Sequence, residues 1–309
     1  MTSRRYLLTT LLTSLALVVL AAAPASSGLL SSGPLSSGLL GSGLLGSGPL
    51  SSGPLSSAAT AGERPFTLGG QPCRLVEVPA AAPLGLPVSC AGVRPGAAVL
   101  TPIGLCTFNF LWVGSDGRRY MGTAGHCILP AEGEMTWAPG TGPEARDSEG
   151  NRVGEFAYAV LEDPADFSLI RLDPGVEASP EMCFFGGPTG LNTDQPSLLE
   201  PVLLQQYGQG IVIGSVLPAR TYLAAGMPSP DHVFATGLVL PGDSGSGVIS
   251  ADGRAVGVVV TTGLHLNGVD LTGADLGTVG ITRLAPQLQR ALNATGLSSL
   301  TLQTAPLAP

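Results

Sequence analysis

The chain has 309 residues, which is enough for one large domain or two small ones with an ample apolar core. Its 14 basic residues are all arginines and face 22 acidic ones, giving a net charge of −8. No basic run could follow a phosphate backbone, so we expect no nucleic acid partner. The lack of lysine excludes a Schiff base with pyridoxal phosphate, a lysine-containing phosphate loop and a serine–lysine dyad.

The first 25 residues have the pattern of an export signal. Arg4 and Arg5 precede an apolar stretch of about 14 residues, and small residues suited to cleavage follow near Ala23 or Ala25. The stretch is short for a membrane span, and no later segment matches it without glycine or polar interruptions. We therefore expect a secreted protein without membrane contact once the signal is removed.

Residues 26–62 form a low-complexity tract of glycine, serine, leucine and proline, and its part up to residue 57 repeats every five residues. Glycine, serine and proline break any helix here and leave the leucines no partner face. We expect a flexible spacer, a cleaved pro-segment or a surface attachment, and we assign the tract no fold.

From about residue 63, short apolar runs such as CTFNFLWVG, RVGEFAYAVL and AVGVVVTTG are separated by glycine, proline, aspartate and asparagine. Many short strands with turn signals between them indicate an all-β sandwich or barrel. Only the C-terminal end favours a helix, because Leu284, Leu288 and Leu292 recur every four residues and the segment 293–296 supplies a stop. We expect this helix to cover the second half of the fold.

Three motifs contain residue types that nucleophilic catalysis needs. MGTAGHCIL places His126 after an apolar strand, DPADFSLIRL places Asp166 at the head of another, and PGDSGSG places Ser244 between glycines. A serine hydroxyl becomes a useful nucleophile when a neighbouring imidazole takes its proton. Asp163 could serve instead of Asp166 or cap a turn; we favour Asp166 because the strand starts directly after it.

Other chemistries have less support. His232 and His265 lack a comparable motif, and we interpret both as ordinary loop or strand residues. An α/β-hydrolase elbow needs Gly-x-Ser-x-Gly, but Ser246 occupies its last position, and that fold orders its triad Ser, Asp, His. Neither Cys-x-x-Cys nor His-Glu-x-x-His occurs, so we expect neither a metal nor an organic cofactor.

In its order of motifs the chain resembles the chymotrypsin-like serine proteases, especially their secreted bacterial branch. The motifs that carry the resemblance are TAGHC, the aspartate before FSLIRL, and PGDSGSG. The resemblance covers roughly residues 100–295. It implies two antiparallel β-barrels, one in residues 63–180 with the histidine and aspartate, the other in residues 181–309 with the serine and the terminal helix. It also implies a serine endopeptidase that acts on a polypeptide through an acyl-enzyme intermediate. We expect this enzyme to be a monomer.

The resemblance gives each motif residue a role. His126 would act as general base and later as general acid, and Asp166 would fix the tautomer of its ring. The backbone N–H groups of Gly242 and Ser244 would form the oxyanion hole. The aspartate between them, Asp243, would need a cation when buried, either a new N-terminal amine or an internal arginine.

The same resemblance bears on specificity. Leu238 matches the base of the primary pocket, where an aspartate would select arginine or lysine. Thr261 and Thr262 match the wall of that pocket, where glycines would leave room for large side chains. We therefore expect a small or medium apolar residue before the scissile bond.

Five cysteines in an oxidising compartment permit two bridges. By the resemblance, Cys106 and Cys127 form the bridge that braces the histidine loop. Of the others, Cys73 and Cys90 are the nearest pair in sequence, while Cys183 is either a buried thiol or the partner of one of them.

One alternative from another class is a catalytically silent binding protein on the same fold. Such relatives typically lose the histidine or the serine, and this chain keeps all three triad residues. A surface structural protein, suggested by the repetitive tract, would leave the three motifs unexplained.

Overall fold

The computed structural model describes residues 65–68, 71–80, 90–194, 201–210, 217–224, 230–264 and 276–309. All of them belong to one unit, residues 57–309. The predicted signal, the low-complexity tract and His265 lie outside the described residues, as does the side chain of Thr262.

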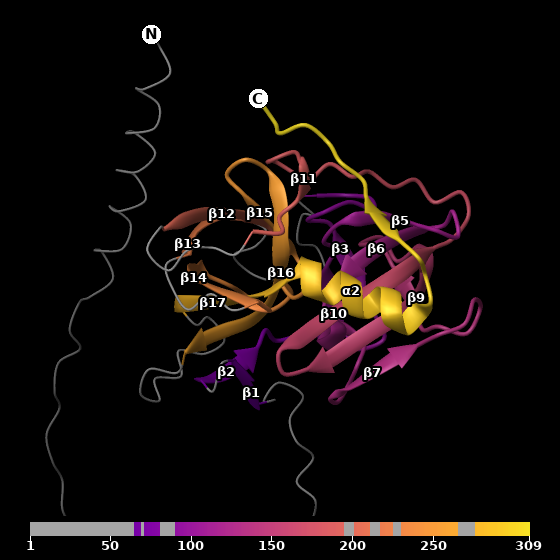
Figure 1. Ribbon diagram of the computed structural model, residues 1–309, viewed down its shortest axis with the longest axis horizontal. Helices are drawn as coiled ribbons and strands as arrows, with labels where there is room; N and C mark the ends of the chain where they lie inside the picture. The colour runs from indigo at the N-terminus through magenta and orange to yellow at the C-terminus, as the bar shows by residue number, and fades with distance from the viewer. Residues whose placement is uncertain are drawn as a thin grey trace, which may run out of the picture. The chain divides into compact units, whose positions relative to one another are not determined.

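Two largely antiparallel sheets and one α-helix make up the described fold (Figure 1). The strands of the first sheet are β3 (Ala98–Leu100), β4 (Leu105–Thr107), β5 (Leu111–Gly114), β6 (Arg119–Thr123), β7 (Gly133–Thr136), β8 (Glu144–Arg146), β9 (Arg152–Glu162), β10 (Ala165–Leu172) and β18 (Leu300–Leu302). They lie in the order β18–β5–β6–β10–β9–β8–β3–β4, and β7 pairs with β9. This sheet curls into an open half-barrel.

The strands of the second sheet are β1 (Pro65–Leu68), β2 (Gln71–Leu75), β11 (Gly190–Leu191), β12 (Val202–Tyr207), β13 (Ala219–Ala224), β14 (His232–Leu238), β15 (Gly247–Ser250), β16 (Arg254–Leu264) and β17 (Leu276–Arg283). Their order is β1–β2–β16–β15–β12–β13–β14–β17, with β11 beside β16. An additional pairing of β16 with β17 closes six of these strands into a barrel. The predicted all-β fold of two barrels with a C-terminal helix is confirmed, although the first barrel is open.

Short segments at the two ends of the described chain cross between the sheets. β1 and β2 precede every strand of the first sheet, yet β2 pairs with β16 of the second. β18, near the C-terminus, returns to pair with β5 of the first sheet. The assignment of the residues from 63 onward to the first barrel was therefore wrong for β1 and β2.

The helix α2 (Leu284–Thr295) confirms the leucine pattern, and it ends at Gly296, whose φ of 72° places it in the left-handed region. Leu284, Leu288 and Ala291 are buried in the core that includes the interior of the first sheet. In Figure 1 the helix begins beside β16 and crosses in front of β10, and it contacts β9, β10 and β16. It covers the junction of the two sheets, not the second half alone as expected.

The helix explains why the longest strands of the first sheet are buried on both faces. In β9 every residue from Val153 to Leu161 is buried, so its side chains point alternately into the barrel and towards covering elements. Glu155 is the only charged residue among these, and it forms an ion pair with Arg171 at 2.7 Å. A strand covered on both faces needs such pairing for any charge that it carries.

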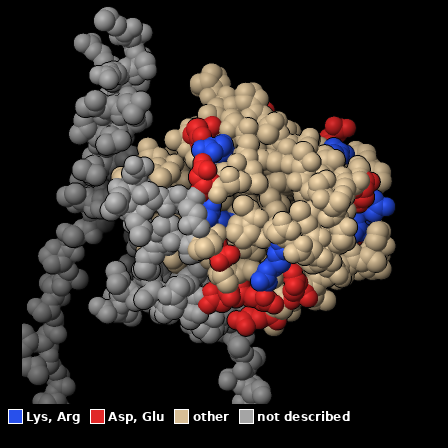
Figure 2. Space-filling model, in the orientation of Figure 1, with Lys and Arg blue, Asp and Glu red and all other residues tan. Residues whose placement is uncertain are grey.

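Figure 2 shows charged side chains in several small groups that mix basic and acidic residues, and in one larger, mainly acidic group at the lower edge of the described surface. Exposed ion pairs of this kind include Arg290 with Glu162 at 2.6 Å and Arg254 with Asp194 at 2.9 Å. The positive charge of each arginine in these pairs is balanced by the negative charge of a neighbouring carboxylate.

Candidate functional site

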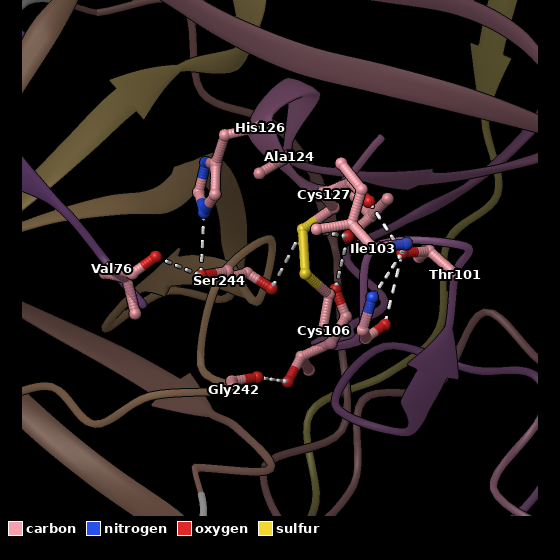
Figure 3. The surroundings of a disulfide bond; sticks show 12 residues. Val76, Thr101, Ile103, Cys106, Ala124, His126, Cys127, Gly242 and Ser244 are labelled. Atoms are coloured by element: carbon pink, nitrogen blue, oxygen red, sulfur yellow. Dashed lines mark hydrogen bonds between the residues drawn. A yellow bond between two sulfur atoms is a disulfide. The ribbon is translucent and has the colours of Figure 1, made fainter. Parts of the chain in front are cut away.

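Three side chains that are far apart in the sequence meet between the two sheets. His126 lies in the short 3₁₀ helix η1 (Gly125–Cys127), Asp166 lies in β10, and Ser244 lies in the turn before β15. The distance from His126 Nδ1 to Asp166 Oδ2 is 2.6 Å, and that from His126 Nε2 to Ser244 Oγ is 2.8 Å. Figure 3 shows the imidazole ring pointing its second nitrogen at the serine. All three residues are buried, with His126 the most exposed at 3%.

Asp166 holds both the backbone and the ring of the histidine. Its Oδ1 accepts the backbone N–H groups of Gly125 (2.6 Å) and His126 (3.0 Å), which leaves Oδ2 for the ring nitrogen. Gly125 allows this close approach because a Cβ there would lie 1.8 Å from the carbonyl oxygen of Val160. With Nδ1 donating to a carboxylate, Nε2 of a neutral ring carries the lone pair that faces Ser244. The carboxylate at the histidine is that of Asp166, not of Asp163.

The glycines around Ser244 are required by the shape of the turn. Gly242 has a φ of +97° and Gly245 a φ of +86°, in the region that favours glycine. A Cβ on Gly245 would also lie 2.0 Å from Thr123 Oγ1. The N–H of Gly245 donates to the carbonyl oxygen of Val259 at 2.9 Å, which ties the turn to β16.

The cation beside Asp243 is an internal arginine, Arg220, in β13. Its guanidinium donates a hydrogen bond to the Asp243 carboxylate, which also accepts the backbone N–H groups of Gly210 (2.9 Å) and Leu240 (2.8 Å). Burial has the largest single effect and acts to lower the pKa of Arg220, but charge attraction and hydrogen bonding by Asp243 and Tyr222 together outweigh it and raise the pKa above its ordinary value. Of the two cations that the sequence left open, the structure contains the arginine.

Two further residues in this buried network, Gln206 and Tyr222, were missed by the sequence interpretation, as was Arg220. Gln206 donates to Ser246 Oγ at 2.6 Å, and its side-chain oxygen accepts hydrogen bonds from Arg220 and the Tyr222 hydroxyl. Burial raises the pKa of Tyr222, which keeps its hydroxyl protonated as a donor. The network gives Ser246 a partner of its own. Gln206 and Arg220 lie in otherwise ordinary strand patterns, so no local signal marked them.

Residues 75–77 contact several of the residues that were expected to form the oxyanion hole and the substrate pocket. The N–H of Gly242 donates to the carbonyl oxygen of Glu77 at 3.0 Å, and Ser244 Oγ lies 3.1 Å from the carbonyl oxygen of Val76. Leu238 is half-buried at the end of β14, and its carbonyl oxygen accepts a hydrogen bond from Tyr222. At the predicted pocket wall, Thr261 is buried and pairs in register with Leu75.

Two disulfide bonds brace the site and its surroundings. Cys106 and Cys127 are joined, as the resemblance implied, and Figure 3 shows this bond near the histidine and the serine. Cys90 is joined to Cys183, with their Cα atoms 6.1 Å apart, so the pairing of Cys90 with Cys73 was wrong. The reason is that the Cys183 segment runs along the residues after Cys90, with the N–H of Cys183 bonded to the Pro95 carbonyl oxygen at 3.1 Å.

Of the other residues considered, His232 lies in β14 as an ordinary buried strand residue. Within the described ranges, no group of three or more histidine, cysteine, aspartate or glutamate residues could hold a metal ion. The same part of the chain has no helix long and apolar enough to cross a membrane.

The open sheet supplies a histidine and an aspartate, the closed barrel supplies a serine, and a C-terminal helix covers the junction. The chain has the chymotrypsin-like fold.

No family model and no curated protein matches this chymotrypsin-like chain. Among solved structures, Nocardiopsis protease matches with 20% identity and a TM-score of 0.44, over 68% of this chain and 98% of that one. Cellulomonas bogoriensis chymotrypsin matches with 20% identity and a TM-score of 0.45, over 68% and 98%. Thermobifida fusca protease A matches with 16% identity and a TM-score of 0.45, over 69% and 100%. At such low identity, the chemistry has to follow from the side chains of the chain itself.

Proposed function

We propose that the chain is a secreted serine endopeptidase in which Ser244 is the nucleophile, His126 the general base and Asp166 the carboxylate that orients the base. The observation that carries this proposal is the continuous set of contacts from carboxylate to imidazole to hydroxyl, at 2.6 Å and 2.8 Å. Both distances are within hydrogen-bonding reach, which a base and a nucleophile need for proton transfer.

In the first half-reaction, Ser244 Oγ attacks the carbonyl carbon of the scissile peptide bond while His126 Nε2 takes the hydroxyl proton. Asp166 stabilises the imidazolium that forms, because its negatively charged carboxylate accepts a hydrogen bond from Nδ1–H while the proton stays on the ring. The imidazolium then protonates the leaving amine, the peptide C–N bond breaks, and an acyl-enzyme ester remains. In the second half-reaction, water gives a proton to Nε2 and attacks the ester carbonyl carbon. The imidazolium then returns the proton to Ser244 Oγ as the ester bond breaks, which releases the acid and restores the serine.

The negative charge that develops on the substrate oxygen needs fixed donors. The N–H groups of Gly242 and Ser244 would supply them, and the buried Arg220–Asp243 pair supports the turn on which they lie. In other enzymes, loss of one such donor costs about 10²–10³ in rate. Donors held in place by a buried network need no reorganisation during the reaction, so this support contributes to catalysis.

The substrate is a polypeptide with a small or medium apolar residue before the scissile bond. The apolar side chain at the base of the predicted pocket, Leu238, offers no charge to attract arginine or lysine. The triad chemistry needs neither metal nor organic cofactor, and a monomer suffices because one chain supplies all three residues. Export agrees with the signal-like residues 1–25 and with two disulfide bonds, which persist in oxidising compartments.

The test is covalent labelling of the folded chain with a fluorophosphonate, taken to its end point and mapped by mass spectrometry. We expect one adduct on Ser244, a much slower reaction in His126→Ala, and none in Ser244→Ala. A peptide library varied at the residue before the cleaved bond should favour alanine, valine or leucine over arginine. Adducts spread over other serines, at rates unaffected by His126→Ala, would refute the proposal.

A further inference from the structure

A segment of the chain itself lies along the strand that forms the predicted pocket wall. β2 pairs antiparallel with β16, with Arg74 opposite Thr262 and Leu75 opposite Thr261. Just past β2, the N–H of Val76 donates to the carbonyl oxygen of Val260 at 3.0 Å. This is the way in which an extended peptide adds to an exposed strand, where backbone hydrogen bonds hold it and pockets receive alternate side chains.

Beyond Val76 the same segment passes over the nucleophile and reaches the first sheet. The Val76 carbonyl oxygen lies 3.1 Å from Ser244 Oγ, as Figure 3 shows. The carbonyl oxygen of Pro79 accepts the N–H of Leu105, in β4, at 2.8 Å. Residues 71–80 thus contact both sheets and pass directly over Ser244.

We propose that residues 71–80 are an inhibitory strand that occupies the place of the substrate, with Val76 in the position of the residue before the scissile bond. The inference rests on the proposed role of Ser244. The side chain of Val76 is 1% exposed and belongs to the apolar cluster that contains Val239 and Val259. A pocket that accepts this side chain fits valine, within the small or medium apolar class proposed for substrates.

The position of the strand explains why it blocks the site without being cut. The N–H of Gly242 is donated to the Glu77 carbonyl oxygen, one residue beyond the carbonyl that faces Ser244. Attack at Val76 would therefore create an oxyanion without the Gly242 donor, a loss worth about 10²–10³ in rate. Substrate is excluded while the strand stays bound in this register.

This arrangement makes release of the strand the step that controls activity. Because Arg220 already pairs with Asp243, the turn that carries Ser244 does not depend on a newly formed N-terminal amine. The Cys90–Cys183 bond fixes the chain that follows the strand. A cut between residues 80 and 90 would therefore free the strand and leave Cys90 attached.

The experiment compares the rate of fluorophosphonate labelling at Ser244 in the full-length chain and in variants. Val76→Pro removes the N–H that bonds to Val260 and the side chain that fills the pocket, so labelling should accelerate about tenfold or more. Glu181→Gln changes an exposed side chain outside the strand and the site and should label at the rate of the unmodified chain. In a second variant, a recognition site for a sequence-specific protease replaces residues 82–88. Cleavage at this site releases the strand from a protein that has already folded. We expect this cleavage to accelerate labelling at Ser244 by a similar factor.

A synthetic peptide of residues 71–80, with serine at position 73, should slow the cut protein again, and a scrambled peptide should not. The same peptide should bind the cut Ser244→Ala protein in fluorescence anisotropy, a readout that needs no activity. Equal labelling rates for the uncut, cut and Val76→Pro proteins would overturn the inference and leave the proposed function intact. A new N-terminus at Glu77, formed only when Ser244 is present, would also overturn it, because the strand would then be a substrate. No labelling in any variant, together with specific peptide binding, would refute the proposed function instead.

Discussion

Removing the charge of Arg220 should damage both the stability and the reactivity of the site. Asp243 is fully buried and Arg220 is 8% exposed, so the Arg220→Leu variant would leave a carboxylate in the interior without its counter-ion. Two backbone N–H groups, from Gly210 and Leu240, would remain as its partners. Breaking a buried ion pair at one partner costs about 3–5 kcal/mol, and we expect this range for Arg220→Leu.

The matched control is Arg254→Leu, because Arg254 is 39% exposed and pairs with Asp194 at the surface. Removing an exposed pair costs about 0–1 kcal/mol. The double variant Arg220→Leu, Asp243→Asn removes both charges and should recover much of the lost stability, which a double-mutant cycle would show as a large coupling free energy.

The free energy of unfolding in urea and the rate of fluorophosphonate labelling measure the two effects separately. We expect Arg220→Leu to lower the labelling rate by about 10²–10³, the effect of losing one oxyanion donor, because the turn carrying Gly242 loses its support. This reasoning would be refuted if the free energy of unfolding of Arg220→Leu lay within about 1 kcal/mol of that of the parent protein and its labelling rate equalled that of the parent.

Three further predictions concern the triad, the turn and a buried histidine. Asp166→Asn should lower the labelling rate at neutral pH by about 10⁴, because an amide can hold the ring in the wrong tautomer, while the far-ultraviolet spectrum stays unchanged. Gly245→Ala should destabilise the protein to urea by about 3 kcal/mol or more, since the new Cβ would meet Thr123 Oγ1 at 2.0 Å. Gly150→Ala, at a φ of +85° in open surroundings, should cost only about 1 kcal/mol. Burial lowers the pKa of His232 to about 3, below its value in the unfolded chain, so its contribution to stability is present above about pH 6.5 and is lost as the pH falls towards 3. Between pH 7 and pH 4 this loss should be about 3 kcal/mol, and His232→Phe should lack that part of the pH dependence in urea unfolding; an unchanged dependence would contradict the reasoning.

The parts of the site that were predictable from the sequence are those with short local patterns. The turn around Ser244 requires positive φ at Gly242 and Gly245, a conformation that favours glycine. The sequence therefore shows this turn directly as a glycine-rich motif. The leucine spacing of α2 and its glycine stop follow from the period of the helix in the same way. Each of these signals is contained in a few consecutive residues.

Long-range pairings were harder to predict because nothing in the local sequence encodes them. No local pattern distinguishes Arg220 from the other arginines as the partner of Asp243, since the two residues meet only when β13 lies beside the turn. Likewise, the sequence left open whether Cys90 pairs with Cys73 or with Cys183, and only the fold brings Cys90 to Cys183. Sequence distance is a poor guide where strands from remote segments pair.

The segment over the nucleophile was unpredictable for a deeper reason. Most of its contacts are made by backbone groups, the N–H of Val76 and the carbonyl oxygens of Val76, Glu77 and Pro79, and every extended segment has such groups. Among the side chains of this segment that the structure describes, those of Leu75 and Val76 are buried, and apolar residues of this kind occur in every strand. A site that reads mainly backbone can bind many polypeptides, and for the same reason it can bind a strand of its own chain that no motif distinguishes. In the proposed enzyme, binding through the backbone of β16 would account both for a polypeptide substrate and for an inhibitory strand that no motif marks.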